Sequence, residues 1–369
     1  MTVLSTLGGP LLWTNTIVES PERFTLHLGV EDITEIENAL VTFKAHELDG
    51  NEVSIANFPL PKLMGRLSQA CKDLHNGKGF FVISGLDIDA YSVEDSVVIY
   101  LGLASYIGDQ HGLQNRGGDV LTHVTDSKLW TVPKEMRHGI HSNRSLPFHS
   151  DMGSDVLCLQ VRECAQTGGG THLASSWSIY NDLVREKPEV IETLFSSSWP
   201  IQVSGSAKYI LAPLMQVHEG KLLTSVDPGR LGPHSNSTTM VQGVPKLSSE
   251  QEKALDALLE SAKQNEIRVP LQKGDMLFVN NWAILHRRES YEDAEASSRH
   301  LVRLWIRNTE LGWAIPENMA VPWKASFERM DVEKVYNVDP IPVYKVPKYS
   351  AGSAAFLIDE GEEEKEEKA

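Results

Sequence analysis

The chain has 369 residues, of which 41% are hydrophobic and 23% charged, a composition typical of a globular protein with ample material for a core. Its formal net charge is -16 and it contains no basic run, which argues against nucleic acid and anionic membrane surfaces as partners. No stretch approaches the roughly 20 apolar residues that a membrane-spanning helix requires. Three cysteines form no disulfide framework, and the N-terminal residues lack the features of a secretory signal, so we expect a cytoplasmic protein.

The N-terminal third predicts helices around one short strand. Residues 1–60 are mixed in character and punctuated by proline, so we expect an irregular N-terminal arm. Leucines at helical spacing then predict a helix that stops at residues 76–77, and the apolar run 79–86 predicts a buried strand. A second helix should follow, with Ser92 as its N-cap and Asp95 three residues later.

The remainder of the chain predicts short strands. Four β-like segments with glycine-rich separators occur at residues 119–126, 155–165, 171–177 and 276–282. One helix is expected over residues 247–264, where Ser249 and Glu252 would form a capping box. Many short strands with a few helices predict a mainly β fold with flanking helices, whose core is a double-sheet jelly roll or barrel.

The domain organisation follows from the same pattern. After the arm, residues 61–350 should form a single domain, with an insert near residues 204–247 that contains many turn signals. The segment 359–369 carries seven acidic residues and two lysines, and we expect this acidic tail to be disordered.

The segment "LPFHSD" carries the first candidate site residues. His149 and Asp151 are two residues apart at the end of a predicted strand, so their side chains should project to the same face. Two such ligands could bind one metal ion, but a third must come from a distant part of the chain. The best candidate is His286, which follows the predicted strand 276–282.

Two arginines near the C-terminal end of the domain should also face inward. Strand periodicity places Arg299, Leu301 and Arg303 on one face. Buried arginines are costly unless they meet anions, and the guanidinium group is suited to binding a carboxylate through two hydrogen bonds.

Together these residues predict a metal site with a place for an organic acid. Two imidazoles and one carboxylate on one face of an octahedron are typical of non-haem Fe(II) oxygenases, in which three positions stay open. A bidentate 2-oxo acid would take two of these positions and dioxygen the third. Zinc is the chemical alternative, because His138 and His141 lie nearby in sequence and zinc hydrolases also use three protein ligands. A non-catalytic binding module of the cupin type is the other alternative.

The ordered motifs resemble the taurine dioxygenase-like family of Fe(II)/2-oxoglutarate oxygenases, and the C-terminal part is similar to that of its fungal members. The resemblance is carried by the segments "GFFVISGL", "LPFHSD", "GGGTHLASSW", "KGDMLFVNN", "ILHRR" and "SRHLVRLW", which span residues 79–307. It implies a double-stranded β-helix of the cupin-like jelly-roll type.

The resemblance also implies residue roles. His149, Asp151 and His286 would bind Fe(II) and carry catalysis. Thr171 and Arg299 would hold the C5 carboxylate of 2-oxoglutarate, and Arg303 would lie near the bound acids. The enzyme would use dioxygen to oxidise a small, acid-bearing molecule by hydroxylation, desaturation or cyclisation, and would release succinate and carbon dioxide. The sequence leaves the identity of the substrate and homo-oligomerisation open.

Several polar residues near these motifs have weaker assignments. For Gln114 and His123 a structural role is favoured over contact with substrate, and the roles of Asn143 and Arg144 are left open. His172 should face away from Thr171 and is not expected to be a ligand. The segment Asn280–Trp282 is expected to orient His286.

Overall fold

The computed structural model describes residues 5–115, 117–203, 209–233, 243–295, 297–329 and 331–344. The predicted acidic tail and parts of the predicted insert lie outside these residues. Within them, the strands are β1 (Thr25–His27), β2 (Phe80–Ser84), β3 (Gln110–His111), β4 (Leu121–Thr125), β5 (Leu146–His149), β6 (Val156–Glu163), β7 (Thr167–Gly168), β8 (Thr171–Ser175), β9 (Trp199–Gln202), β10 (Tyr209–Ala212), β11 (Met215–His218), β12 (Lys221–Thr224), β13 (Ile267–Val269), β14 (Met276–Asn280), β15 (Ile284–Arg288), β16 (Tyr291–Glu292) and β17 (His300–Arg307).

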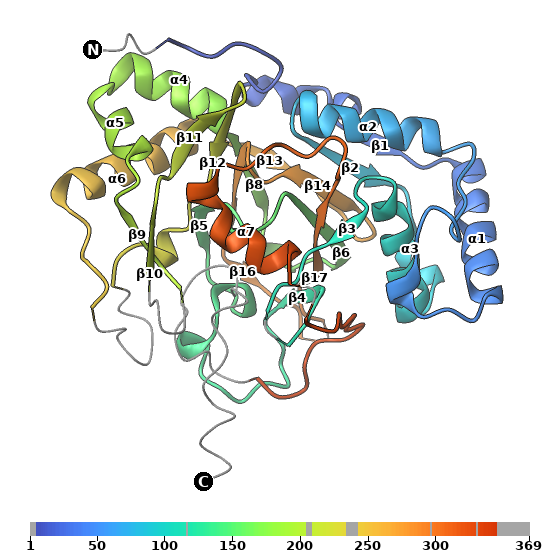
Figure 1. Cartoon of the computed structure of the whole chain (residues 1–369). Helices are drawn as coiled ribbons and strands as arrows, with labels where there is room; N and C mark the ends of the chain where they lie inside the picture. Colours follow the sequence, from blue (N-terminus) through green and yellow to red (C-terminus); the bar gives the residue numbers. More distant parts are fainter. Residues whose placement is uncertain are drawn as a thin grey trace.

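Two sheets form the centre of the molecule (Figure 1). The larger sheet has the order β1-β2-β14-β6-β17-β3, and β4 also pairs with β17. The smaller sheet has the order β13-β8-β15-β5. The β9/β10 and β11/β12 pairs are antiparallel hairpins, and β7 pairs with β16. The predicted insert thus contributes β10, β11 and β12 to the part of the chain that the structure describes.

The central strands of the larger sheet are buried on both faces because most of their residues on either face are apolar. In β14, Leu277 and Val279 pack into the core between the two sheets, whereas Met276 and Phe278 pack into a second core on the opposite face. The same alternation holds along β2, β6 and β17. A sheet that is apolar on both faces needs a layer of structure on each side.

Helices supply the outer layers. They are α1 (Val30–Ala45), α2 (Met64–Asn76), α3 (Val93–Ser105), α4 (Ser176–Glu186), α5 (Glu189–Phe195), α6 (Ser249–Gln264) and α7 (Ala320–Phe327). The first three pack against the second core of the larger sheet, and α4 to α6 gather at the other side of the molecule (Figure 1). No described helix has the length and apolar character that would let it cross a bilayer.

The structure differs from the sequence-based expectations in three respects. Helical residues outnumber strand residues in the described segments, so strands dominate less than the sequence suggests. The segment expected to be an irregular arm contains α1, and it contains β1, which pairs in parallel with β2. The N-cap of α6 is Ser248, which accepts from the backbone of Gln251, so the predicted capping box lies one residue too far along the chain. The N-cap predicted at Ser92 is confirmed.

A set of buried histidines packs within this scaffold. Nδ1 of His123 on β4 lies 2.8 Å from Nε2 of His300 on β17, and Nε2 of His123 lies 2.9 Å from the carbonyl oxygen of Asn337. Burial lowers the pKa of His123 to about 4 and that of His300 to about 3. Burial also lowers the pKa of His75 and of His111 to about 4.

These histidines predict acid lability. Their folded-state pKa values lie below the ordinary value of about 6.5, so between pH 6.5 and 4 the unfolded chain binds protons that the folded chain does not. The free energy of unfolding should therefore fall as the pH is lowered through this window, which urea unfolding at a series of pH values measures. A free energy of unfolding that stays constant or rises from about pH 7 to pH 5 would contradict this account.

Candidate active site

Two histidines face each other across a strand pair of the smaller sheet. His149 ends β5, and it is the direct partner of His286 in the antiparallel register with β15. Opposite residues in such a pair project to the same face, and the two ring centroids lie 4.1 Å apart. The pairing of β5 with β15 thus brings together two residues that are 137 positions apart, the difference between 286 and 149.

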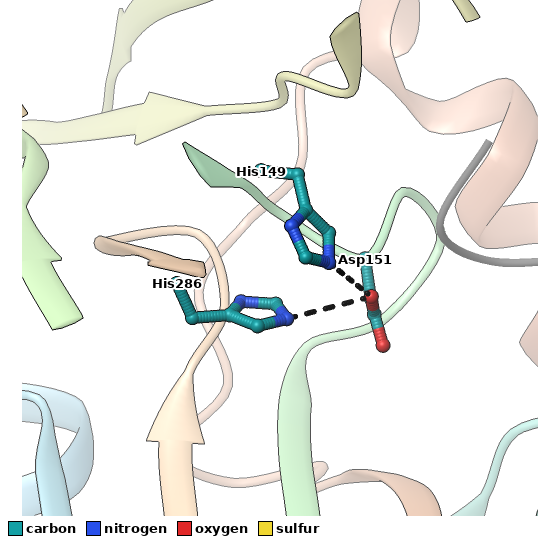
Figure 2. Close-up of side chains that lie close together, drawn as sticks. All are labelled: His149, Asp151 and His286. Atoms are coloured by element: carbon teal, nitrogen blue, oxygen red, sulfur yellow. Dashed lines mark ion pairs between the residues drawn. The ribbon is translucent and has the colours of Figure 1, made fainter. Parts of the chain in front are cut away.

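Asp151 completes the group from the loop that follows β5. Its Oδ1 lies 3.7 Å from Nε2 of His149 and 3.7 Å from Nε2 of His286, and Figure 2 shows both rings turned toward this oxygen. Oδ1 is buried and has no hydrogen-bond partner among the described residues. These three side chains are the single group of metal-ligand type that the described residues form, with ligand atoms within 4.8 Å of one another.

The second carboxylate oxygen of Asp151 is held by the larger sheet. Oδ2 accepts a hydrogen bond from Nε1 of Trp305 at 2.9 Å and one from Nη1 of Arg303 at 3.1 Å. Burial alone would raise the pKa of Asp151, but the positive charge of Arg303, the two histidines and the Trp305 hydrogen bond keep it below its ordinary value. The carboxylate is therefore ionised, with one oxygen satisfied and the other left for a cation.

The backbone around Asp151 is fixed by an asparagine. The side chain of Asn281 accepts from the backbone nitrogen of Asp151 at 2.8 Å and donates to the carbonyl oxygens of Asp151 and Ser154, also at 2.8 Å. The neighbouring Trp282 donates to Asp155 at 2.6 Å. The segment 280–282 was expected to orient His286, and this expectation is wrong for Asn281 and Trp282, because they hold the loop that carries Asp151.

The tautomer of His149 follows from its surroundings. Its Nδ1 lies 2.9 Å from the carbonyl oxygen of Pro147, which can only accept, so Nδ1 carries a proton and Nε2 is the nitrogen that faces Asp151. Burial, and after it the neighbouring His149, lowers the pKa of His286 to about 3. The His286 imidazole is therefore suited to act as a neutral metal ligand.

A pocket extends from these three residues between the two sheets. Its polar lining includes Thr171 at the start of β8 and Arg299 directly before β17. Arg299 is 5% exposed, and its Nη1 is buried without an acceptor among the described residues. A side chain at Gly169, whose φ is +69°, would come within 2.9 Å of Arg299, so the glycine-rich turn makes room for the guanidinium.

The arginines follow the predicted strand pattern. Arg299, Leu301 and Arg303 line this pocket, while Val302 and Leu304 pack into the core on the other face of the sheet. Arg303 has a further contact that the sequence left open, because its Nε donates to Oε1 of Gln114 at 2.7 Å.

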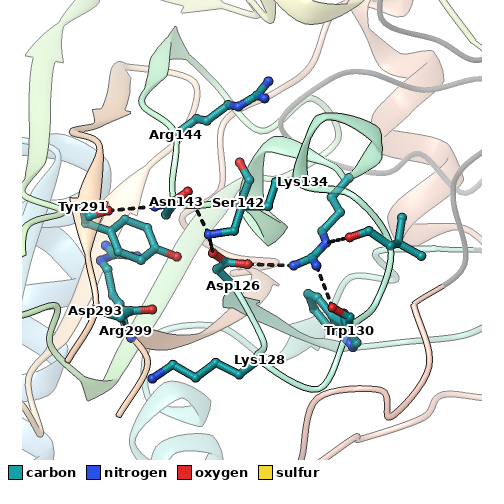
Figure 3. Close-up of polar contacts among 12 residues, drawn as sticks. Asp126, Lys128, Trp130, Lys134, Ser142, Asn143, Arg144, Tyr291, Asp293 and Arg299 are labelled. Carbon is teal, nitrogen blue, oxygen red and sulfur yellow. Dashed lines mark hydrogen bonds and ion pairs between the residues drawn. The ribbon is translucent and has the colours of Figure 1, made fainter. Parts of the chain in front are cut away.

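The weaker candidates belong neither to the metal-ligand group nor to the lining of this pocket. His123 packs against His300, and His172 faces Glu289 with a distance of 2.7 Å between Nε2 and Oε1. Asn143 donates to the backbone carbonyl of Tyr291, a contact drawn in Figure 3, and the carbonyl oxygen of Arg144 accepts from Arg288.

A second cavity of about 120 Å³ adjoins the pocket and shares Ile140 and Arg303 with it. Rings from distant parts of the chain line it, and they belong to His123, Trp130, His138, His141 and Tyr344. His138 and His141, the additional ligands that a zinc site would need, thus line this cavity and are not part of the metal-ligand group.

The residues of the site fit a metal ion and a bound acid. The buried Oδ1 of Asp151 lacks a partner among the described residues and faces two imidazoles, and Nη1 of Arg299 lacks an acceptor in the pocket beside them. Two imidazoles and one carboxylate form the donor set of the facial triad.

The family model for taurine catabolism dioxygenase TauD, TfdA family matches residues 42–305, which is most of the chain. The chain belongs to this family. It is an Fe(II)/2-oxoglutarate-dependent dioxygenase, and its cofactors are those of the family, namely Fe(II), 2-oxoglutarate and dioxygen.

Two curated relatives cover most of this dioxygenase. It is 32% identical to the taurine hydroxylase-like protein SAT17 of Stachybotrys chartarum over 352 residues, which is 91% of this chain and 89% of the relative. It is 28% identical to FR-33289 synthase of Streptomyces rubellomurinus over 326 residues, which is 85% of this chain and 93% of that protein.

Solved structures share the fold of this dioxygenase. Asparagine oxygenase in complex with Fe(II), 2S,3S-3-hydroxyasparagine and succinate matches with a TM-score of 0.59 and 14% identity, covering 79% of this chain and 98% of that chain. The non-heme iron oxygenase OrfP in complex with Fe and alpha-ketoglutaric acid matches with a TM-score of 0.57 and 16% identity, covering 77% and 93%.

The contacts of Asn281 predict an effect on metal affinity. Asn281→Ala removes the three hydrogen bonds that set the Asp151 loop, so iron affinity should fall about 10–100-fold, as is typical when a partner of a metal ligand is lost. Titration of the metal-free protein with Fe(II) under anaerobic conditions measures this. Asn280→Ala is the matched control, because the Asn280 side chain donates to Leu74 and accepts from the backbone of Trp282 but forms none of the three hydrogen bonds to the Asp151 loop. Equal iron affinity in the two variants would contradict the role of Asn281.

Proposed function

We propose that His149, Asp151 and His286 hold the ferrous ion of this dioxygenase. The observation that carries this assignment is the partnerless Oδ1 of Asp151, buried 3.7 Å from the Nε2 atom of each histidine. The two facing sheets support the further assignment of the core as a double-stranded β-helix of the jelly-roll type.

Thr171 and Arg299 would bind the distal carboxylate of 2-oxoglutarate. Both line the pocket that begins at the three metal-ligand residues, and the unsatisfied Nη1 of Arg299 supports a charged acceptor there. When bound, Fe(II) and 2-oxoglutarate supply the activation of dioxygen, with release of succinate and carbon dioxide, that oxidises a carbon–hydrogen bond of the substrate.

The protein's own residues would bind the cosubstrate and exclude water. Apolar side chains from both sheets line the pocket, and they include Leu146, Leu157, Leu159 and Leu301. In such surroundings the interaction of Arg299 with a carboxylate is stronger than in water. Arg303 has a different task from Arg299, because its hydrogen bond keeps the Asp151 carboxylate oriented and ionised.

The substrate would be a small molecule bound in the adjoining cavity. This cavity shares Arg303 with the cosubstrate pocket, so a ligand there would lie beside the proposed metal site. Trp130, His141 and Tyr344 offer ring surfaces for its apolar part. Arg303 supports the acid-bearing substrate that the sequence suggests, although its hydrogen bonds to Asp151 and Gln114 mean that a substrate acid would share it. Hydroxylation is the default outcome, and desaturation or cyclisation would need the same placement of the substrate.

The assignment of the ligands is tested by replacing His286. In His286→Ala, the iron content of the purified protein should fall from about one ion per chain to almost none, and 2-oxoglutarate-dependent formation of succinate should stop, because two ligands bind the metal too weakly. Circular dichroism should show that the variant stays folded. The matched control is His172→Ala, which removes a histidine of the neighbouring strand that faces Glu289. Full iron content and full succinate formation in His286→Ala would exclude this metal site.

A further inference from the structure

Arg288 lies next to the proposed cosubstrate site. It follows His286 by two positions on β15, so strand geometry projects the two side chains to the same face. In the register of β15 with β8, Arg288 is the direct partner of Thr171. It also lines the same pocket as Arg299. The pocket therefore brings together the metal-ligand group, Thr171, Arg288 and Arg299.

The guanidinium group of Arg288 is only partly satisfied by the protein. Its Nη2 donates to the carbonyl oxygen of Ser142 at 2.8 Å, to that of Gly139 at 3.2 Å and to that of Arg144. Its Nε and Nη1 are buried and have no acceptor among the described residues. Arg288 is 5% exposed and lines the pocket, so its free donors are almost completely shielded from solvent. Buried donors without acceptors are expensive, which points to an acceptor that binds in the pocket.

The two arginines are positive charges that form no direct ion pair among the described residues. Within the part of the chain that the structure describes, no carboxylate lies within ion-pair distance of Arg288 or Arg299. The ring of Tyr291 holds both in place, with its centroid 5.1 Å from the Arg288 guanidinium carbon and 5.4 Å from that of Arg299. Figure 3 shows the Tyr291 ring beside Arg299, next to the segment that carries Asn143 and Arg144. Two guanidinium groups that share one buried ring repel each other unless an anion lies between them.

We infer that Arg288 is a second guanidinium ligand for the distal carboxylate of the 2-oxo acid, acting together with Arg299 and Thr171. This inference rests on the proposed function of the pocket. Nη1 is a free donor of the Arg288 guanidinium group, and one oxygen of a carboxylate in the pocket could accept from it. With Nη2 already fixed by the three carbonyl oxygens, little side-chain freedom would be lost on binding.

A specific consequence is selectivity for dicarboxylic 2-oxo acids. A 2-oxo acid without the distal carboxylate would leave Nη1 of Arg288 and Nη1 of Arg299 without an acceptor, and such a site rejects the analogue that lacks the charged group. 2-Oxopentanoate has the chain length of 2-oxoglutarate but ends in a methyl group. It is therefore the matched probe for this part of the pocket.

A purely structural role of Arg288 makes a different prediction. If Arg288 only fastened the segment 139–144 through Nη2, its replacement would weaken the binding of both 2-oxo acids to a similar extent, or of neither. A direct contact with the distal carboxylate affects 2-oxoglutarate alone. The comparison of the two acids on one and the same variant thus separates the two roles, even where the variant is less stable.

The experiment is a calorimetric titration of the Fe(II)-loaded full chain with each acid under anaerobic conditions. Arg288→Ala and Arg288→Lys should each weaken 2-oxoglutarate binding about tenfold or more, the size expected for hydrogen bonds to a charged group, and change 2-oxopentanoate binding less than about twofold. Lysine keeps the charge but loses the rigid guanidinium group that the three carbonyl oxygens hold in place, so it should not restore the affinity. The control is Arg268→Lys on β13, whose side chain is 59% exposed and lies outside the pocket, and it should bind both acids like the unmodified protein.

The outcomes separate this inference from the proposed function. If the unmodified protein binds 2-oxoglutarate no more tightly than 2-oxopentanoate, the proposed cosubstrate pocket is wrong. If Arg299→Ala loses this preference and both Arg288 variants keep it, the pocket is right and the role of Arg288 is overturned. Parallel losses for both acids in the Arg288 variants would also overturn it, and would assign Arg288 to the support of the segment 139–144.

Discussion

The site depends on the division of one carboxylate group between two tasks. Oδ2 of Asp151 is bound by Trp305 and Arg303 from the larger sheet, and this leaves Oδ1 facing the two histidines of the smaller sheet. A carboxylate that kept both oxygens satisfied within the protein would have no free acceptor for a cation. One that kept neither would be too costly to bury as an anion. The arrangement arises only where the two sheets meet, so the fold and the site form together.

The electrostatic balance of the pocket follows from this arrangement. Arg303 compensates the charge of Asp151, so that pair is close to neutral without a ligand. Arg299 and Arg288 have no such partner among the described residues, and burial, followed by the charge of Arg299, lowers the pKa of Arg288 to about 10. The pocket therefore carries excess positive charge away from the metal-ligand group, where a distal carboxylate would bind. Bound anion and protein would then stabilise each other, since a ligand that binds only the folded state adds to its stability.

Much of this site could be predicted from local patterns. The two-residue spacing of His149 and Asp151, and the strand periodicity that turns Arg299 and Arg303 inward, hold in the structure. Alternate residues of a strand share a face, so the sequence could also have placed Arg288 beside His286 and Trp305 beside Arg303. Neither residue was among the predicted site residues. The pairing of β5 with β15 and the hydrogen bonds of Asn281 to the Asp151 loop could not be predicted, because they join residues more than 100 positions apart.

The fold shows the same limit. Apolar runs identified the buried strands β2, β6 and β14, but the helix α1 was missed in a segment that looked irregular. Its apolar residues Ile36, Leu40 and Phe43 lie on one face and pack into the second core. That core is formed by residues from distant parts of the chain, so it becomes visible only in the packed structure. The helices around that core also contribute to the excess of helical over strand residues in the described segments.

The most direct test of the account is the visible absorption spectrum of the protein with Fe(II) and 2-oxoglutarate in the absence of dioxygen. A ferrous ion held by His149, Asp151 and His286 would bind 2-oxoglutarate directly, so adding the acid to the Fe(II)-loaded protein should produce a weak metal-to-ligand charge-transfer band. The Zn(II)-loaded protein should show no such band, because the filled d shell of Zn(II) is not readily oxidised. A spectrum that stays unchanged at saturating 2-oxoglutarate, with the iron still bound, would contradict the account.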